Sequence, residues 1–456
     1  MARTGESVPS ADQVGDDREL PEVDLDAEAV TAASAAEAAL AVAPELVANS
    51  VAEYVRAWWQ RVRGGDTGVL PIVVGLIVIM ALFQALNHSF LTAGNITNLL
   101  VQGGVFVLLG MAEIFVLILG EIDLSLGYVA GLSAVIVALL MSPSVNLPWI
   151  VAVVAGLATG TAIGVLQGTL VTRLHLPSFV VTLAGQLGWW GLMIWVVDTT
   201  NPTSGGVISV TNPVVFNLVN GNMTALEGWI TVVLAVVAYA AFSLTRDNRR
   251  RRNGLAVPPF GLTLLRTGVV AVAAVVLLLI VDANRGTATV PLSGMPPVVI
   301  VVPVIMILWT FLLSATRFGR YVYAIGGNRE AARRAGVNLT RIRTGAFALA
   351  GLTGAMAGIV YESRLGSISI GIDGGTLVLF GVASAVIGGA SLMGGRGKPI
   401  HALLGGIVIA AIYNGMVLMG LSVAVQYMIT ALVLLAALTI DRVARRGRAF
   451  RSSAED

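Results

Sequence analysis

The sequence contains no cysteine and little charge, and each shortage narrows what the protein can be. Without cysteine the chain has no disulfides, no thiol chemistry and no cysteine-ligated metal. The only histidines, His88, His175 and His401, are scattered along the chain, so we expect no metal site and no cofactor. Charged residues make up 12% of the 456 residues, against about 25% in an average soluble domain. A soluble fold cannot bury a chain that is 56% hydrophobic, because surface area does not shrink fast enough with size.

The sequence is rich in long apolar runs, and these predict a polytopic membrane protein. A spanning helix needs about 20 apolar residues, and about 17 are tolerable. From Gly68 onward such runs alternate with short polar breaks, which predicts an all-α fold of roughly twelve transmembrane helices. The predicted spans lie near 69–86, 101–119, 125–141, 149–171, 178–197, 229–244, 262–281, 298–315, 345–361, 376–392, 400–419 and 424–440. The run 376–392 is short and rich in glycine, so it either spans or is re-entrant.

The arginines predict which side of the membrane each break faces. Basic residues gather in the cytoplasmic loops of membrane proteins. With the N-terminus inside, every basic residue except Arg285 and Arg364 falls in an inner loop or an inner tail. The inner ones include Arg249–Arg252 and the arginines from Arg317 to Arg343. We therefore expect an even number of spans, both termini in the cytoplasm, and a multi-pass protein of the cell (inner or plasma) membrane.

The two ends of the chain differ in composition from the part between them. Residues 1–60 are strongly acidic, and we interpret them as a disordered cytoplasmic tail. Residues 61–445 form the predicted transmembrane domain, and 446–456 a second cytoplasmic tail. The arginines and tryptophans of Arg56–Arg63 suit the headgroup layer of a lipid membrane. The formal net charge is only +2, and we expect no nucleic-acid partner.

Two carboxylates lie between apolar runs in the segment Gly120–Gly127. A charge at the centre of a bilayer costs about 2.5–3.5 kcal/mol on insertion scales, so Glu121 and Asp123 are expected to pair or to line a pathway. Asp123 also precedes Leu-Ser at the start of a predicted span, where an oxygen acceptor caps a helix. Cap and functional site both remain open at this point. Together with Ser125, and with Thr182 in a later span, these residues are our candidates for the substrate pathway and its gating.

The inner loop 316–343 contains the pattern of a short capped helix. Gly326 and Gly327 form a turn, and Asn328 is a good N-cap for a helix over Arg329–Ala335 that Gly336 closes. A charged, capped helix in a cytoplasmic loop has no need to pack on lipid, which favours docking of a soluble partner over a bare charge anchor. The candidate docking residues are Gly326, Gly327, Asn328, Glu330, Ala331, Ala332, Arg333 and Gly336.

The glycine-rich segment Val386–Ile400 superficially resembles a phosphate-binding loop. The motif requires glycine five residues before Gly397 and a hydroxyl residue after Lys398, where the chain has Leu392 and Pro399. The sequence therefore shows no nucleotide site of its own and no catalytic residue.

Four segments, in this order, resemble the permeases of the ribose- and xylose-type sugar ABC importers, which are related to the branched-chain amino acid permeases. These segments are Gly120–Gly127, Pro177–Gly185, Gly319–Asn338 and Val386–Gly397. The likeness is greatest to the xylose type, because residues 229–296 form an inserted span pair with a basic cytoplasmic loop and because Glu121 stands where ribose-type members tend to have glycine.

The resemblance implies a non-catalytic permease subunit for a monosaccharide, with a xylose-like pentose favoured. It further implies a homodimer, cytoplasmic ATP-binding subunits that dock on loop 316–343, and an extracytoplasmic sugar-binding protein. The chain departs from the family at Val378 and Phe380, where members often have an acidic pair, and at Glu113 in the second span.

Two other hypotheses stay open at the level of sequence. One is an ion-coupled secondary transporter, for which Glu113, Glu121 or Asp123 would carry a proton, although the halves show no repeated motif. The other is a permease for branched-chain amino acids or another small solute. A membrane enzyme is disfavoured, because no metal cluster or activated nucleophile is evident.

Overall fold

The computed structural model describes residues 50–63, 68–201, 205–255, 257–287, 289 and 291–452, and nearly all of their regular structure is helical. The predicted acidic tail lies outside the described residues as far as residue 49. Residues Val51–Arg63 form the helix α3. At the other end, α18 runs over Val423–Ser452 and takes in most of the second predicted tail.

Every predicted span falls on a helix. These helices are α4 (Leu70–Leu86), α5 (Ala93–Leu117), α6 (Leu126–Met141), α7 (Trp149–Arg173), α8 (Ser178–Thr200), α10 (Ala225–Arg252), α11 (Phe260–Asp282), α12 (Val298–Ala315), α15 (Leu339–Leu365), α16 (Gly374–Ile387), α17 (Pro399–Leu418) and α18. Among the described residues, 8 helices are long and apolar enough to cross a membrane, whereas α4, α6, α16 and the apolar part of α18 are shorter. The chain is thus a helical polytopic membrane protein, while the exact number of spans and the side of its termini stay predictions.

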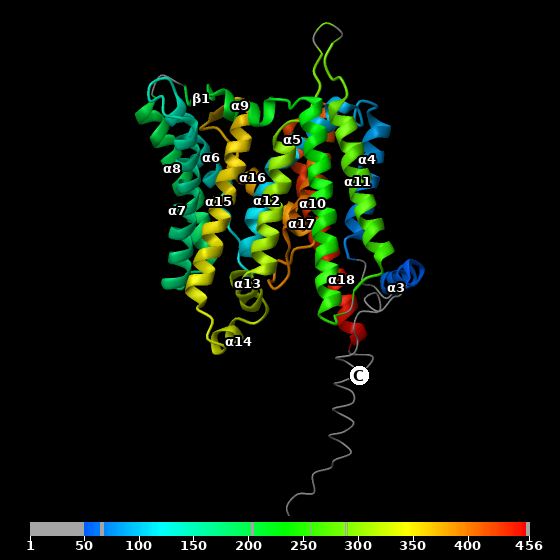
Figure 1. Cartoon of the computed structure of the whole chain (residues 1–456). Helices are drawn as coiled ribbons and strands as arrows, with labels where there is room; N and C mark the ends of the chain where they lie inside the picture. The colour runs from blue at the N-terminus through cyan, green and yellow to red at the C-terminus, as the bar shows by residue number, and fades with distance from the viewer. Residues whose placement is uncertain are drawn as a thin grey trace, which may run out of the picture. The chain divides into compact units, whose positions relative to one another are not determined.

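Short elements lie at the two ends of the long helices (Figure 1). At one end are α13 (Arg317–Gly327) and α14 (Arg329–Arg334), which form the predicted docking loop. At the other end are α9 (Pro213–Asn220) and β1 (Val207–Ser209). Strand β1 pairs antiparallel with β2 (Ser367–Ser369), with Ile208 opposite Ile368. This small sheet departs from the all-α prediction and joins the loop after α8 to the end of α15.

Backbone contacts divide the chain into two units. The smaller consists of Met1–Gln60 and Ser243–Leu265, and the larger of Arg61–Phe242 and Arg266–Asp456. Within the smaller unit, Thr263 Oγ1 donates a 2.7 Å hydrogen bond to Asp247 Oδ2, which joins the two arms of the basic hairpin. All the elements that carry the candidate site belong to the larger unit.

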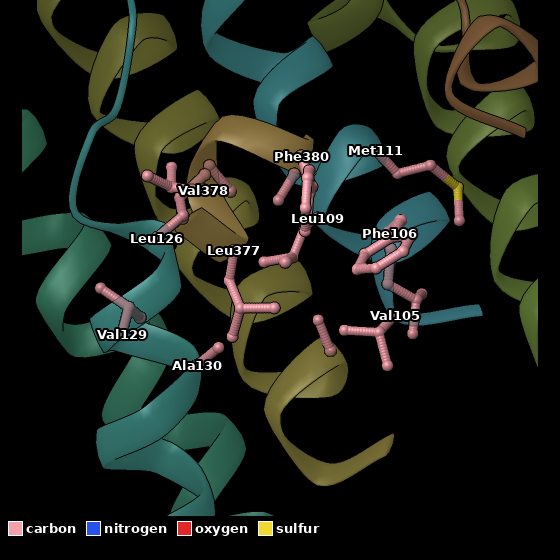
Figure 2. Packing of buried hydrophobic residues seen from close by; sticks show 14 of the residues in the cluster. Val105, Phe106, Leu109, Met111, Leu126, Val129, Ala130, Leu377, Val378 and Phe380 are labelled. Carbon is pink, nitrogen blue, oxygen red and sulfur yellow. The ribbon is translucent and has the colours of Figure 1, made fainter. Parts of the chain in front are cut away.

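Helix α5 forms the centre of the larger unit, because almost all of its residues from Val101 to Leu117 are buried. It packs against α15, α16 and α17, and Figure 2 shows its side chains meeting those of α6 and α16. Val378 and Phe380, which replace the acidic pair of the resembled family, lie in this core. The Phe380 ring centroid is 4.9 Å from that of Phe106 and 5.6 Å from that of Tyr413. These two positions are therefore packing positions in this chain.

Glycines allow α7 and α15 to approach closely. A Cβ atom on Gly164 would lie 2.1 Å from the carbonyl oxygen of Phe347, and one on Gly160 would lie 2.5 Å from that of Gly351. Small residues at a spacing of four let membrane helices bring their backbones together, which compensates for the absence of a hydrophobic driving force in lipid. This contact fixes α15, whose first two turns carry a residue of the candidate site, Arg343.

Candidate functional site

The segment Ile118–Ser125, which we call the α5–α6 break, separates two buried helices. Helix α5 ends in a Schellman motif, in which Glu121 N–H donates to Val116 O over 3.1 Å and Gly120 N–H to Leu117 O over 2.9 Å. Gly120 has φ +76°, a left-handed conformation that a side chain would strain. The tight turn brings Glu121 inward, and its side chain is only 4% exposed.

Glu121 pairs with two arginines from the charged loop 316–343. Arg343 Nε, in the first turns of α15, donates to Glu121 Oε1 over 2.6 Å. Arg329 Nη2, at the start of α14, donates to the same oxygen over 3.1 Å. The Arg343 side chain is 13% exposed, whereas that of Arg329 is 49% exposed. Glu121 thus ties both α14 and α15 to the α5–α6 break.

Asp123, two residues after Glu121, is also buried and organises the start of α6. Its Oδ1 accepts from Ser125 N–H over 3.0 Å and from Ser125 Oγ over 2.6 Å. Gln167 of α7 hydrogen-bonds to Ser125 Oγ over 2.8 Å. In the amide orientation that satisfies all its neighbours, Gln167 also donates to Asp123 Oδ2 over 3.2 Å and accepts from Trp189 Nε1 over 2.9 Å. The Asp123 carboxylate therefore serves as an acceptor for the turn before α6 and as an anchor for α7.

Thr182 belongs to the same cluster. Its Oγ1 donates to Ile122 O over 3.4 Å, which links α8 to the α5–α6 break. The structure thus brings together the four predicted pathway residues, Glu121, Asp123, Ser125 and Thr182. All four are buried and have partners within the chain, so a role in gating requires the break itself to move. That role stays a prediction.

Helix α14 forms where the sequence predicts it, because both of its ends carry local signals. Asn328 Oδ1 accepts from Ala331 N–H over 2.9 Å. At the other end Gly336 has φ +81°, and Val337 N–H donates to Ala332 O over 3.1 Å. Glu330 Oε1 lies 2.8 Å from Arg333 Nη2 and 3.1 Å from Arg334 Nε. Hydrogen bonds from Arg333 and then Arg334 lower the pKa of the exposed Glu330 carboxyl, so α14 presents a charged pattern at neutral pH.

One predicted docking residue faces the wrong way. Ala332 is 5% exposed and packs into the hydrophobic core of its own chain. Ala332, one of the candidate docking residues, therefore has almost no exposed surface to offer a partner, because one face of this six-residue helix lies on the bundle. Ala331 is exposed, as are Gly327, Asn328, Glu330, Arg333 and Gly336, and docking at these residues stays a prediction.

Backbone contacts reinforce the same junction. Gly395 N–H donates to Ile118 O over 2.8 Å. A Cβ atom on Gly326 would lie 1.9 Å from Ile118 O, so only glycine fits at the end of α13. Tyr323 Oη donates to Gly397 O over 2.6 Å. The glycine-rich segment that superficially resembles a phosphate loop is thus packed against the α5–α6 break and the docking loop.

Sequence reasoning missed Arg329, Arg343 and Gln167. The sequence contained a signal for Arg343. An arginine at the start of an apolar run needs a carboxylate partner, and Glu121, between two other apolar runs, is such a carboxylate. Nothing local pointed to Gln167. In the part of the chain that the structure describes, no group of three or more histidine, aspartate or glutamate residues could hold a metal ion.

The helices and this junction define a class of protein: a polytopic membrane protein whose charged loop is anchored to the core of its helical bundle. The chain belongs to the family described as the branched-chain amino acid transport system / permease component, whose model matches residues 95–438.

Individual relatives are similar over most of the chain. The xylose transport system permease protein XylH of Escherichia coli (strain K12) is 31% identical over 379 residues, which is 83% of this chain and 92% of that protein. The protein of the same name from Haemophilus influenzae is 33% identical over 382 residues, 84% of this chain and 98% of that protein. The ribose import permease protein RbsC of Escherichia coli (strain K12) is 28% identical over 369 residues, 81% of this chain and 92% of that protein. No solved structure matches the chain.

These matches confirm the resemblance to the permeases of xylose- and ribose-type sugar importers. With the long apolar helices, they identify the chain as a multi-pass protein of the cell membrane.

Proposed function

We propose that this chain is the membrane-spanning permease subunit of an ATP-driven monosaccharide importer, and that a xylose-like pentose is its cargo. The observation that carries the proposal is the link from an exposed, charged helix to a buried break in the bundle. Arg329 and Arg343 make this link through Glu121. Relatives named for xylose and ribose support the class of cargo.

In this proposal the chain, with its permease domain at 61–445, hydrolyses no ATP and works with partners. Two copies form the pathway between them, two cytoplasmic ATP-binding subunits dock on α14, and an extracytoplasmic sugar-binding protein delivers the cargo. A docking surface needs exposed charges that fix its register, and Glu330 with Arg333 and Arg334 supplies them. Ala331 leaves room for the partner surface to approach.

The contacts suggest how docking reaches the pathway. When a docked subunit moves α14, Arg329 pulls on Glu121 and thereby on the α5–α6 break. Arg343 transmits the same movement to α15. Asp123 and Ser125 connect the break to α6 and α7, so four helices shift in concert. Because packed cores switch between discrete arrangements, a small displacement at α14 becomes a change of state in the bundle.

Uptake into proteoliposomes tests the proposed function. Labelled D-xylose is expected to enter only when the chain is reconstituted with its ATP-binding subunit and binding protein and ATP is supplied on the cytoplasmic side. The rival hypothesis, an ion-coupled carrier, is favoured by the fully buried carboxyl groups of Glu113 and Glu362, of which the Glu362 oxygens have no hydrogen-bond partner among the described residues. Uptake by the isolated chain, driven by a proton gradient without ATP, would support that rival.

Ala331→Trp is expected to weaken association with the ATP-binding subunit by at least about tenfold, because an interface packed around alanine has no room for an indole. Ala331 is exposed in the isolated chain, so the variant should fold and melt as the wild type does. Association is measured by titrating labelled ATP-binding subunit onto the chain in lipid nanodiscs. Asn253→Trp, in the other charged loop, is the matched control and should bind normally. Normal association of Ala331→Trp would remove α14 from the docking surface.

A cysteine placed at Asn253 tests the predicted sidedness. The chain has no other cysteine, and Arg249–Arg252 precede this exposed turn. The positive-inside rule places the turn in the cytoplasm, so an impermeant maleimide added to intact cells should leave Asn253→Cys unlabelled, while permeabilised cells should label it. Efficient labelling of intact cells would reverse the proposed orientation of the α10–α11 pair.

A further inference from the structure

Polar and aromatic side chains from five helices converge where α16 begins. Asp373 caps α16, and its Oδ1 accepts from Thr376 N–H over 3.0 Å. Its Oδ2 accepts a 2.7 Å hydrogen bond from the Tyr427 hydroxyl of α18. Asp373 itself is exposed, and Tyr427 is 46% exposed, so both groups remain accessible from outside the core. An acceptor and an aromatic ring thus stand open to a ligand at the same place.

A stacked aromatic pair flanks Asp373 on the side of α8. The ring centroids of Tyr128 and Trp190 are 5.6 Å apart with an interplanar angle of 28°. Trp190 is 39% exposed, and its Nε1 donates to Ile370 O over 3.2 Å, which holds the indole in one orientation. Gly374 leaves room for the Tyr128 ring, since a Cβ atom there would lie 2.8 Å from it. The result is a fixed aromatic platform beside a carboxylate.

A guanidinium group completes the cluster. Arg364, at the end of α15, lies within electrostatic range of Tyr361 and Tyr413, and Tyr361 lies within the same range of Asp373. The Arg364 side chain is half-buried, yet within the described residues it makes no hydrogen bond and no ion pair. A partly desolvated guanidinium without an acceptor is costly, so this group calls for a partner.

We infer that Asp373, Trp190, Tyr427 and Arg364 form a binding site for a neutral monosaccharide in the permease itself. The inference rests on the proposed function and deepens it, because it locates the contact with the cargo. A pyranose has an apolar C–H face, which stacks on an aromatic ring, and a rim of hydroxyls, which both donate and accept. Trp190 supplies the ring, Asp373 accepts, and Arg364 donates. Ligand sites are commonly built in this way, from aromatic walls and a few polar groups that fix orientation.

The balance of charge favours a neutral sugar over an anion. One carboxylate and one guanidinium stand in the same cluster, so a sugar acid would meet repulsion from Asp373 as well as attraction from Arg364. The site lies on elements distinct from the α13–α14 docking loop, so the two are separable by experiment.

Equilibrium binding of labelled D-xylose to the purified chain in lipid nanodiscs tests the site, with D-ribose and D-glucuronate as competitors. Trp190→Ala and Arg364→Met are each expected to raise the Kd for xylose by about tenfold or more, through loss of stacking and of a charge-assisted hydrogen bond. Trp195→Ala is the matched control, because Trp195 lies on the same helix and is 63% exposed, and it should bind as the wild type does. Trp190→Phe keeps the ring and guards against misfolding of the alanine variant. D-ribose should compete with xylose, and D-glucuronate should not.

The outcomes separate this site from the proposed function. If the wild-type chain binds no monosaccharide at millimolar concentrations, or if Trp190→Ala binds xylose normally, the site is wrong, while association with the ATP-binding subunit at α14 can still succeed. If sugar binds but the ATP-binding subunit does not, the importer proposal fails and the site stands. Displacement of xylose by D-glucuronate but not by D-ribose would overturn the assignment to neutral sugars.

Discussion

Replacing Glu121 with alanine is expected to destabilise the folded chain by about 3–5 kcal/mol and to abolish coupled uptake. Removing one member of a buried ion pair leaves the other charge uncompensated, and this, rather than the lost attraction, sets the magnitude. Arg343 is the charge left behind, because its side chain is only 13% exposed. Thermal unfolding in mild detergent measures the stability, and uptake by the assembled importer measures the coupling.

Three further variants make the Glu121 result specific. Glu330→Ala removes the exposed pairs with Arg333 and Arg334 and should leave stability nearly unchanged, since surface pairs contribute little. Arg329→Met should spare most of the stability, because Arg343 still neutralises Glu121, yet it should impair coupling. The exchange Glu121→Arg with Arg343→Glu should recover part of what either single change loses. If Glu121→Ala unfolds at the wild-type temperature, the pair with Arg343 is not a structural link.

The positions of the helices could be predicted because length and apolarity are local properties. Every predicted span has its helix, but several bounds shift for reasons that the runs themselves do not contain. Helix α5 begins at Ala93 rather than near residue 101, because its polar first turns find partners. Asn95 Nδ2 donates to Asn414 Oδ1 of α17 over 2.8 Å, and Thr97 Oγ1 donates to Ala93 O over 2.8 Å. Such polar residues lower the hydropathy of a segment and so argue against a span, whereas in the folded chain their hydrogen-bonding groups have partners.

In the candidate site, too, local features could be predicted from the sequence and long-range contacts could not. Helix α14 could be predicted from Asn328 and Gly336, since a cap and a left-handed turn depend only on neighbours in sequence. The partners of Glu121 lie 208 and 222 residues away, and only the packing of α15 against the bundle brings them near. The inward orientation of Ala332 was beyond prediction for a related reason, because the rotation of a short helix is set by the surface on which it lies.

Because α7 and α15 approach closely, we expect Gly→Ala to raise the stability of the chain at one glycine and to lower it at another. In a helix interior, Gly→Ala normally stabilises by up to about 1 kcal/mol, because alanine loses less backbone entropy. Gly188→Ala on α8 should follow that rule, since nothing lies within 4 Å of the added Cβ. Gly164→Ala should instead destabilise by about 1–3 kcal/mol, as overpacked cores do. Its Cβ would meet the Phe347 carbonyl oxygen at 2.1 Å, and backbone cannot rotate away as a side chain can.

The consequence of Gly164→Ala should extend beyond stability. Moving α15 away from α7 displaces the first turns of α15, and with them Arg343 and its pair with Glu121. Unfolding temperatures in detergent compare the two variants directly, and uptake by the assembled importer shows whether the junction has moved. Helix propensity alone would make both alanine variants more stable than the wild type. That result would contradict the close packing of α7 on α15, whereas a lower unfolding temperature for Gly164→Ala alone identifies the backbone contact as the cause.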